Sequence, residues 1–164
     1  MNMDLAGLER EEDGEVMLTQ FCIDPEVYTS QGRSFTFMVK QLMCRESRQQ
    51  VGQPSAARKP VQDNKSRKVR FEARSSPLAD DPVAVLAECC SKLPEYRTGD
   101  LPLKEIVNRI LLAGGNEPRS VMEIYQETID WVGRGDGRAI NPGVILRLLE
   151  TDAYYGFTRA ATES

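Results

Sequence analysis

The residues best able to do chemistry in this chain are its four cysteines, because the sequence contains no histidine. Zinc-binding cysteines are usually paired a few residues apart, and a nucleophile activated by an imidazole base requires a histidine. The cysteines are Cys22, Cys44, Cys89 and Cys90, and none of them has the spacing CxxC. The sequence therefore predicts no metal ligands, no cofactor and no catalytic residues. We interpret Cys22 and Cys44 as apolar filler in a protein that is not an enzyme.

A dense group of basic side chains offers a second kind of chemistry, contact with phosphates or with an acidic protein surface. Residues 45–82 have an excess of basic over acidic side chains, whereas residues 1–44 and 83–164 are both net acidic. The net charge of the whole chain is −4, which excludes a protein that coats nucleic acid along its length. Besides binding phosphates or an acidic protein surface, this basic stretch can be interpreted as a solubilising tether that binds no partner. The candidate contact residues are Arg58, Lys59, Lys65, Arg67, Lys68, Arg70 and Arg74.

One short motif lies within this basic group. Lys68 and Val69 are followed by one spacer residue and then by Phe71. This pattern resembles the docking motif that protein phosphatase 1 recognises. The resemblance implies that the extended segment would add to the edge of a sheet while Val69 and Phe71 fill two pockets.

Composition divides the chain into four segments: an acidic start, an apolar segment, a polar and basic stretch, and a regular C-terminal part. The polar stretch is rich in Gln, Pro, Ser and charge and lacks apolar periodicity, which predicts disorder. The segments are 1–15 for a disordered tail, 16–45 for a short strand and a helix, 46–81 for a disordered basic linker and 82–160 for a helical module. The fold class expected is mainly α, a small helical bundle with a short C-terminal β wing.

The segment 16–45 contains one amphipathic helix. Ser34 can cap a helix over 35–44, and five of its apolar residues recur at the spacing of a single helix face. These residues are Phe35, Met38, Val39, Leu42 and Met43. Such a face must be covered. Both the C-terminal module and a partner protein remain candidates for covering it.

Helix boundaries in the C-terminal module are marked by capping residues. Asp81 and Asn141 each precede a proline, Asp100 can cap a further helix, and Ser120 with Glu123 forms a capping box. Pro94 should end the first of these helices, and Gly114-Gly115 should end the second. After the last helix come strand-forming residues around Gly156, which are Tyr154, Tyr155, Phe157 and Thr158.

Three helices followed directly by a short aromatic strand, over residues 101–160, resemble a winged-helix or helix-turn-helix domain. The resemblance implies that residues 144–151 take the place of the recognition helix, with Arg147 and Thr151 as its contact residues, and that residues 154–159 start the wing. DNA binding is the family's usual function. The predicted recognition helix has only one arginine, beside Glu150 and Asp152, and this is too little positive charge for contacting phosphates and bases. This charge balance favours a module that binds protein.

The function predicted from sequence is that of an adaptor or regulatory protein that acts through protein–protein interaction of the helical module. One alternative is a transcription-related regulator that binds nucleic acid through the basic linker and the module; such binding should weaken steeply as salt rises. Another is a viral or structural assembly component. The acidic start lacks the features of a secretory signal and no apolar run is long enough to span a membrane, which predicts a cytoplasmic protein, or a nuclear one in a eukaryote, without a membrane partner.

Overall fold

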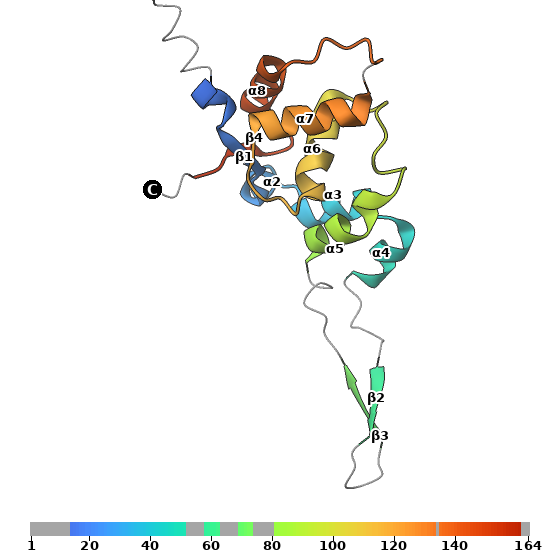
Figure 1. Ribbon diagram of the computed structural model, residues 1–164. Coiled ribbons are helices and arrows are strands. Elements are labelled where there is room, and N and C mark those ends of the chain that lie inside the picture. The colour runs from blue at the N-terminus through green and yellow to red at the C-terminus, as the bar shows by residue number, and fades with distance from the viewer. Residues whose placement is uncertain (1–13, 52–57, 63–68, 74–80, 134, 162–164) are drawn as a thin grey trace, which may run out of the picture.

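Helices form most of the chain, and a small three-stranded antiparallel sheet lies beside them (Figure 1). The computed structural model describes residues 14–51, 58–62, 69–73, 81–133 and 135–161. The helices are α2 (Pro25–Ser30), α3 (Phe35–Leu42), α4 (Arg45–Gln50), α5 (Pro82–Glu88), the 3-10 helix η2 (Cys90–Lys92), α6 (Leu103–Ala113), α7 (Val121–Val132) and α8 (Pro142–Thr151). The strands are β1 (Gln20–Ile23), β2 (Arg58–Gln62), β3 (Val69–Ala73), β4 (Arg119–Ser120) and β5 (Phe157–Arg159).

Most of the predicted helix starts are confirmed by the hydrogen bonds that their capping side chains accept. The Ser34 hydroxyl accepts from the Phe37 amide at 3.1 Å, and the Asn141 side chain accepts from the Val144 amide at 3.0 Å. The capping box of Ser120 and Glu123 is present, as is the Asp81 cap. The prediction for Asp100 is wrong, because α6 begins after Pro102 and has no side-chain cap.

The strand at the centre of the sheet comes from the N-terminal part of the chain. The strand order is β4-β1-β5, so β1 pairs with both neighbours. Phe21 lies opposite Arg119 on one side and Arg159 on the other. The predicted C-terminal wing is corrected accordingly: only Phe157–Arg159 form a strand, and that strand completes a sheet built around β1. The segments 16–45 and 82–160 therefore share one sheet.

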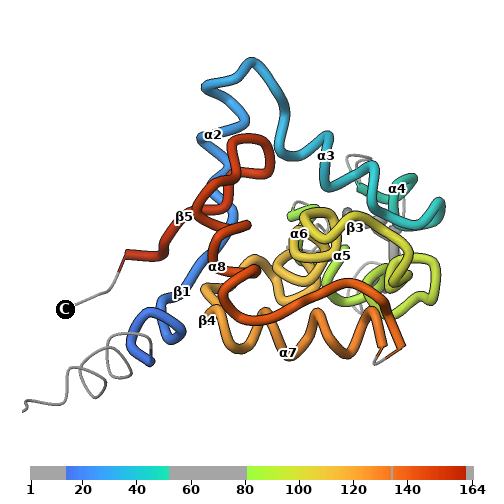
Figure 2. Tube along the Cα trace, turned by 90° about the horizontal axis from the view of Figure 1, so that it is seen from above, coloured from blue at the N-terminus to red at the C-terminus, as the bar shows by residue number. Residues whose placement is uncertain are grey.

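The hydrophobic core also joins these two segments. Phe21 and Ile23 of β1 and Val39 of α3 are fully buried in the same cluster as the apolar residues of α6, α7 and α8. Helix α3 lies on the same side of the molecule as α5 and contacts it (Figure 2). The side-chain amide of Asn108 in α6 is 3.8 Å from the sulfur of Met38. The buried face of the predicted 35–44 helix is thus covered within the chain, and part of its opposite face stays exposed.

The predicted linker 46–81 contains more regular structure than composition indicated. Its first residues belong to α4, where Ser47 and Val51 are buried. Arg48 fixes this helix by donating hydrogen bonds to carbonyl oxygens at the end of the preceding helix, including that of Met43 at 3.1 Å. Strands β2 and β3 pair in antiparallel fashion and extend away from the helices in Figure 1. Regular elements thus lie within the segment predicted to be disordered, and the rest of 46–81 lies outside the described residues.

Among the described helices, none is both long and apolar enough to cross a bilayer.

Candidate functional site

A pocket of about 470 Å³ lies between α3, α6 and the turn that precedes β5. Two of the large hydrophobic side chains that the described structure exposes line it, Phe37 at 63% exposure and Tyr154 at 59%. Tyr28 and Asn108, both almost completely buried, also line the pocket. The site thus combines an exposed aromatic rim with buried polar side chains, and we call it the aromatic pocket.

One arginine orders the rim of the aromatic pocket. The guanidinium of Arg33 lies 4.4 Å from the ring centre of Tyr28 and 4.2 Å from that of Tyr154. It also donates a hydrogen bond to the backbone carbonyl of Tyr154. Cation–π contacts of this kind hold both rings against the same cation. Arg33 therefore connects α2 to the turn on the other side of the pocket.

The turn that carries Tyr154 is built by Asp152. Its buried carboxylate accepts from the amides of Tyr154 at 3.1 Å, Tyr155 at 2.9 Å and Gly156 at 3.0 Å. Gly156 has φ of +78°, and a Cβ there would lie 2.9 Å from the backbone oxygen of Asp24. A side chain at that position would both strain the backbone and collide with it. The turn therefore needs an acid at 152 and glycine at 156.

Two buried polar atoms at the aromatic pocket have no hydrogen-bond partner among the described residues: Tyr28 Oη and Asn108 Oδ1. Burial raises the pKa of Tyr28 to about 12, so its hydroxyl is neutral at neutral pH and can donate or accept a hydrogen bond. By contrast, the Tyr155 hydroxyl donates to Glu105 at 2.8 Å. Buried polar groups normally have partners, and each exception calls for an explanation. Both atoms are covered by neighbouring side chains, so a ligand with a donor and an acceptor would reach them only after those side chains moved aside.

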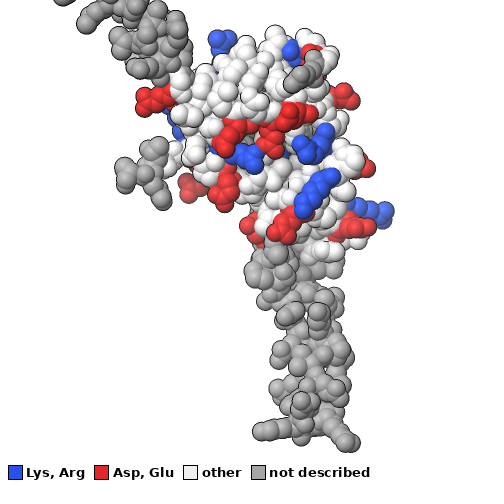
Figure 3. All heavy atoms as spheres, viewed as in Figure 1, with Lys and Arg blue, Asp and Glu red and all other residues white. Residues whose placement is uncertain are grey.

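The predicted recognition residues do not lie in the aromatic pocket. Arg147 and Thr151 are exposed on α8, where the Thr151 hydroxyl donates to the Arg147 carbonyl at 2.7 Å. On the same helix, Glu150 forms an ion pair with Arg159. The described part of the face in Figure 3 also shows basic and acidic side chains interspersed. The exposed face of α8 therefore has mixed charge, as its sequence indicated.

The predicted basic contact residues are only partly described. Arg58 and Lys59 belong to β2, and Val69, Arg70 and Phe71 of the predicted docking motif belong to β3. Pairing of the two strands sets Lys59 opposite Glu72. It thereby brings three of the predicted bases into one two-stranded sheet. The remaining candidates, Lys65, Arg67, Lys68 and Arg74, lie outside the described residues.

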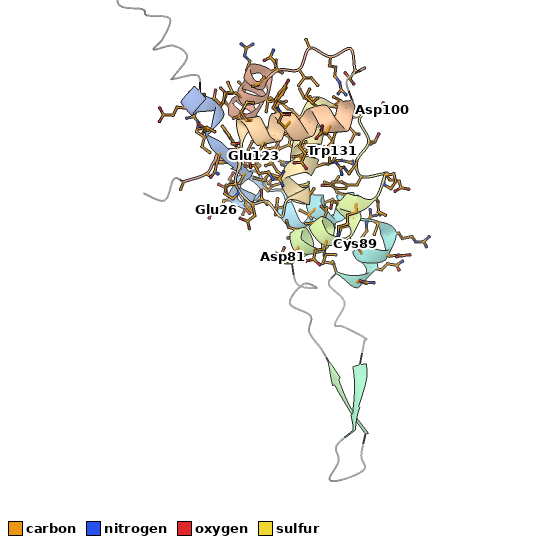
Figure 4. The ribbon with its side chains drawn as sticks, in the orientation of Figure 1. Glu26, Asp81, Cys89, Asp100, Glu123 and Trp131 are labelled. Carbon is orange, nitrogen blue, oxygen red and sulfur yellow. The ribbon has the colours of Figure 1, made fainter. Side chains whose placement is uncertain are left out.

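Three of the four cysteines lie together, although their sequence spacing predicted no metal site. The sulfur atoms of Cys44, Cys89 and Cys90 are all within 4.8 Å of one another. The predicted helix from Pro82 to Pro94 is interrupted at Cys89, where α5 ends, and η2 starts at Cys90 (Figure 4 labels Cys89). This break turns adjacent cysteines toward the start of α4. A second pocket, of about 460 Å³, is lined in part by Cys44 and Cys90.

Hydrogen bonds lower the pKa of the Cys44 thiol. The Ser47 side chain and the Ser47 amide, at 3.2 Å and 3.5 Å from the sulfur, lower the pKa of Cys44 to about 7. Burial raises the pKa of Cys90 and that of Cys22 on β1. The same cluster therefore holds one thiol that ionises near neutral pH and one that resists ionisation.

Alkylation of Cys44 by iodoacetamide is expected to titrate near neutral pH. The thiolate is the reactive species, so the rate should fall as the pH drops below about 7 and level off above it. Peptide mapping by mass spectrometry measures the rate at each cysteine. Ser47→Ala should shift the midpoint upward, because the thiolate loses its hydroxyl donor. A midpoint that the substitution leaves in place would contradict this origin of the acidity.

In comparisons with known proteins, no protein-family model, curated protein or solved structure matches the chain.

Sequence reasoning missed the residues that form these sites. Asn108 lies on the buried side of α6, and the sequence signal there is weak: one amide in an otherwise apolar helix face. Tyr28 and Arg33 stand in a short segment without clear periodicity. The cysteines were identified as chemically capable, but only the break at Cys89 shows that three of them meet.

Proposed function

We propose that this protein is a non-enzymatic adaptor or regulatory protein that binds a peptide segment of a partner protein in the aromatic pocket. The proposal rests on the combination, at this pocket, of exposed aromatic side chains and buried polar atoms that are unpaired within the described structure. Exposed Phe37 and Tyr154 border a pocket in which Tyr28 Oη and Asn108 Oδ1 lack hydrogen-bond partners among the described residues. Aromatic side chains around a pocket with a few polar groups are typical of protein-recognition sites.

The expected ligand is a peptide that inserts an apolar side chain between Phe37 and Tyr154 at the rim of the aromatic pocket. Its backbone carries both groups that the buried atoms require, an amide N–H for Asn108 Oδ1 and a carbonyl for the Tyr28 hydroxyl, and reaches them once the side chains that cover these atoms move aside. The anchoring side chain would contact Phe37 and Met38 from α3 and Tyr154 from the opposite wall. A purely apolar ligand could fill the pocket but would leave both buried polar atoms without hydrogen bonds. A peptide supplies the apolar side chain and the hydrogen-bonding groups together.

The order of elements supports a winged-helix-like module as the scaffold of this binding site. Helix α6, strand β4, helices α7 and α8 and strand β5 follow one another, and β1 completes the sheet. Mixed charge on the exposed face of α8 fits the use of such a module for protein binding better than for DNA binding. The proposed peptide site lies at α3 and α6. Peptide binding there does not use α8, the helix that would enter a groove of DNA in a DNA-binding winged-helix domain.

Selection of peptides from a random displayed library tests the proposal. Bound peptides should share an aromatic or large aliphatic residue, and the affinity of a selected peptide should fall at least about tenfold in Phe37→Asp and in Tyr154→Ala. Both residues are exposed, so the fold should survive. Leu18→Asp is the matched control, because Leu18 is equally exposed, at 69%, and does not line the pocket. Peptides whose affinity is unchanged by both pocket variants would refute the proposal.

A further inference from the structure

Three thiols from two separate parts of the chain converge at one point. Cys44 lies between α3 and α4, whereas Cys89 and Cys90 lie at the junction of α5 and η2. All three sulfur atoms are within 4.8 Å of one another, and those of Cys44 and Cys90 are 3.6 Å apart. The chain's fourth cysteine, Cys22, is on β1 and does not belong to this group.

These separations are close to those that a thiolate-bound metal ion requires. Zinc binds thiolate sulfur at ~2.3 Å, and in a tetrahedral site this places neighbouring sulfurs ~3.8 Å apart. The contact between Cys44 and Cys90 is already at that spacing. No separation in the cluster exceeds it by more than about 1 Å, a difference that a small adjustment of the side chain of exposed Cys89 can supply.

Backbone hydrogen bonds orient two of the three sulfurs. The Cys44 amide donates to Cys90 Sγ at 3.3 Å, and the Ser47 amide donates to Cys44 Sγ at 3.5 Å. Outer hydrogen bonds of this kind orient metal ligands and stabilise their charge. Arg48 fixes the loop that carries Cys44 by donating to the carbonyls of Lys40 and Met43 at 3.1 Å each. Two of the three ligands are therefore held in place before an ion arrives.

We propose that Cys44, Cys89 and Cys90 bind one thiophilic metal ion with a filled d shell, Zn²⁺ in the first instance. Each thiol loses its proton to solvent and forms one sulfur–metal bond, so no electron is transferred. Exposed Cys89 gives the ion access from solvent. A fourth position would face the pocket that Cys44 and Cys90 line together with Glu95 and Arg109. Three thiolates and a divalent ion leave one negative charge, and the guanidinium of Arg109 in the same pocket is already ion-paired with Glu105.

A bound ion would connect α4 to α5 through metal bonds as well as packing. The three soft ligands favour Zn²⁺ or Cu⁺ over Mg²⁺ or Ca²⁺, which prefer oxygen. The sulfurs of Cys44 and Cys90 could instead form a disulfide. Such a disulfide would use two thiols and leave Cys89 without a role. Convergence of all three favours the metal ion.

Titration of the reduced full-length chain with Co²⁺ tests the proposal, because thiolate ligation produces a sulfur-to-cobalt charge-transfer band. One equivalent should saturate the band, and Zn²⁺ should displace Co²⁺ and abolish it. Separate titrations with Zn²⁺ and Cu⁺ against chromophoric chelators distinguish the two ions. Cys44→Ser and Cys89→Ser should each lower the affinity by on the order of 100-fold. Cys22→Ser is the matched control and should bind like the parent chain.

A second measurement covers the case in which a variant fails to fold. In the unsubstituted chain, Zn²⁺ should slow alkylation of Cys44 and Cys89 and leave that of Cys22 unchanged. Three outcomes would overturn the proposal. The first two are a charge-transfer band that persists without Cys44 and a lack of protection of Cys44 by Zn²⁺. The third is that the reduced chain, kept in air with Zn²⁺, forms a Cys44–Cys90 disulfide, with dissolved oxygen accepting the two electrons.

Discussion

A chain that starts at residue 82 is expected not to fold, although it contains the whole helical module. It lacks β1, so β4 and β5 lose their common partner, and the core loses several fully or nearly fully buried side chains. These are Phe21, Ile23, Tyr28, Val39 and Met43. Burial of each contributes about 1.5–3 kcal/mol, so the total loss is on the order of 10 kcal/mol, comparable with the entire stability of a typical domain.

Circular dichroism and a thermal melt of the fragment 82–164 measure this effect. The expected result is weak helicity without a cooperative transition. Adding residues 14–51 as a separate polypeptide provides the control, because it returns β1, α2, α3 and α4 and should restore cooperative unfolding. A fragment 82–164 that melts cooperatively by itself would show that the module does not depend on β1.

Asn116→Ala is expected to destabilise the protein by about 3 kcal/mol, through the loss of two hydrogen bonds and added backbone strain. The Asn116 side chain accepts from the Ile23 amide and donates to the Ile23 carbonyl, both at 2.8 Å. It thereby continues the pairing of β1 beyond the end of β4. Its φ of 59° is in the left-handed region, which asparagine tolerates better than alanine.

Asn116→Gly separates the two contributions. Glycine accepts the left-handed backbone without strain but makes neither hydrogen bond, so the loss should be smaller, about 2 kcal/mol. Chemical denaturation monitored by Trp131 fluorescence measures both variants. Equal stability of the glycine variant and the parent chain would show that the bonds to Ile23 contribute nothing.

Local features of this fold could be predicted well from the sequence. Side-chain caps and glycine stops act within a few residues, so Ser34, Ser120, Asn141 and Gly114 mark true helix boundaries. Charge on α8 was also foreseen, because it depends only on which residues occupy its exposed positions. These properties require no knowledge of distant parts of the chain.

Long-range pairing could not be predicted in the same way. Strands β4 and β5 contain two and three residues, too few for an alternating pattern to be recognised. The central position of β1 depends on partners near the opposite end of the sequence. Likewise, the aromatic pocket joins Tyr28 to Tyr154, and the thiol cluster joins Cys44 to Cys90. The positions of these residues in the sequence do not indicate that they are in contact, because the fold of the intervening segments determines which residues meet.

The central position of β1 has a consequence for synthesis of the protein on the ribosome. Of the described strands, β1 is the first to be made, and Phe21 pairs with Arg119 of β4 and with Arg159 of β5, the last of them. One hydrogen-bonding edge of β1 therefore stays without its final partner until Arg159 has been translated. Contacts between such distant residues slow folding, and unpaired strand edges invite association with other chains. The order of synthesis thus leaves the sheet incomplete after every described helix has been made.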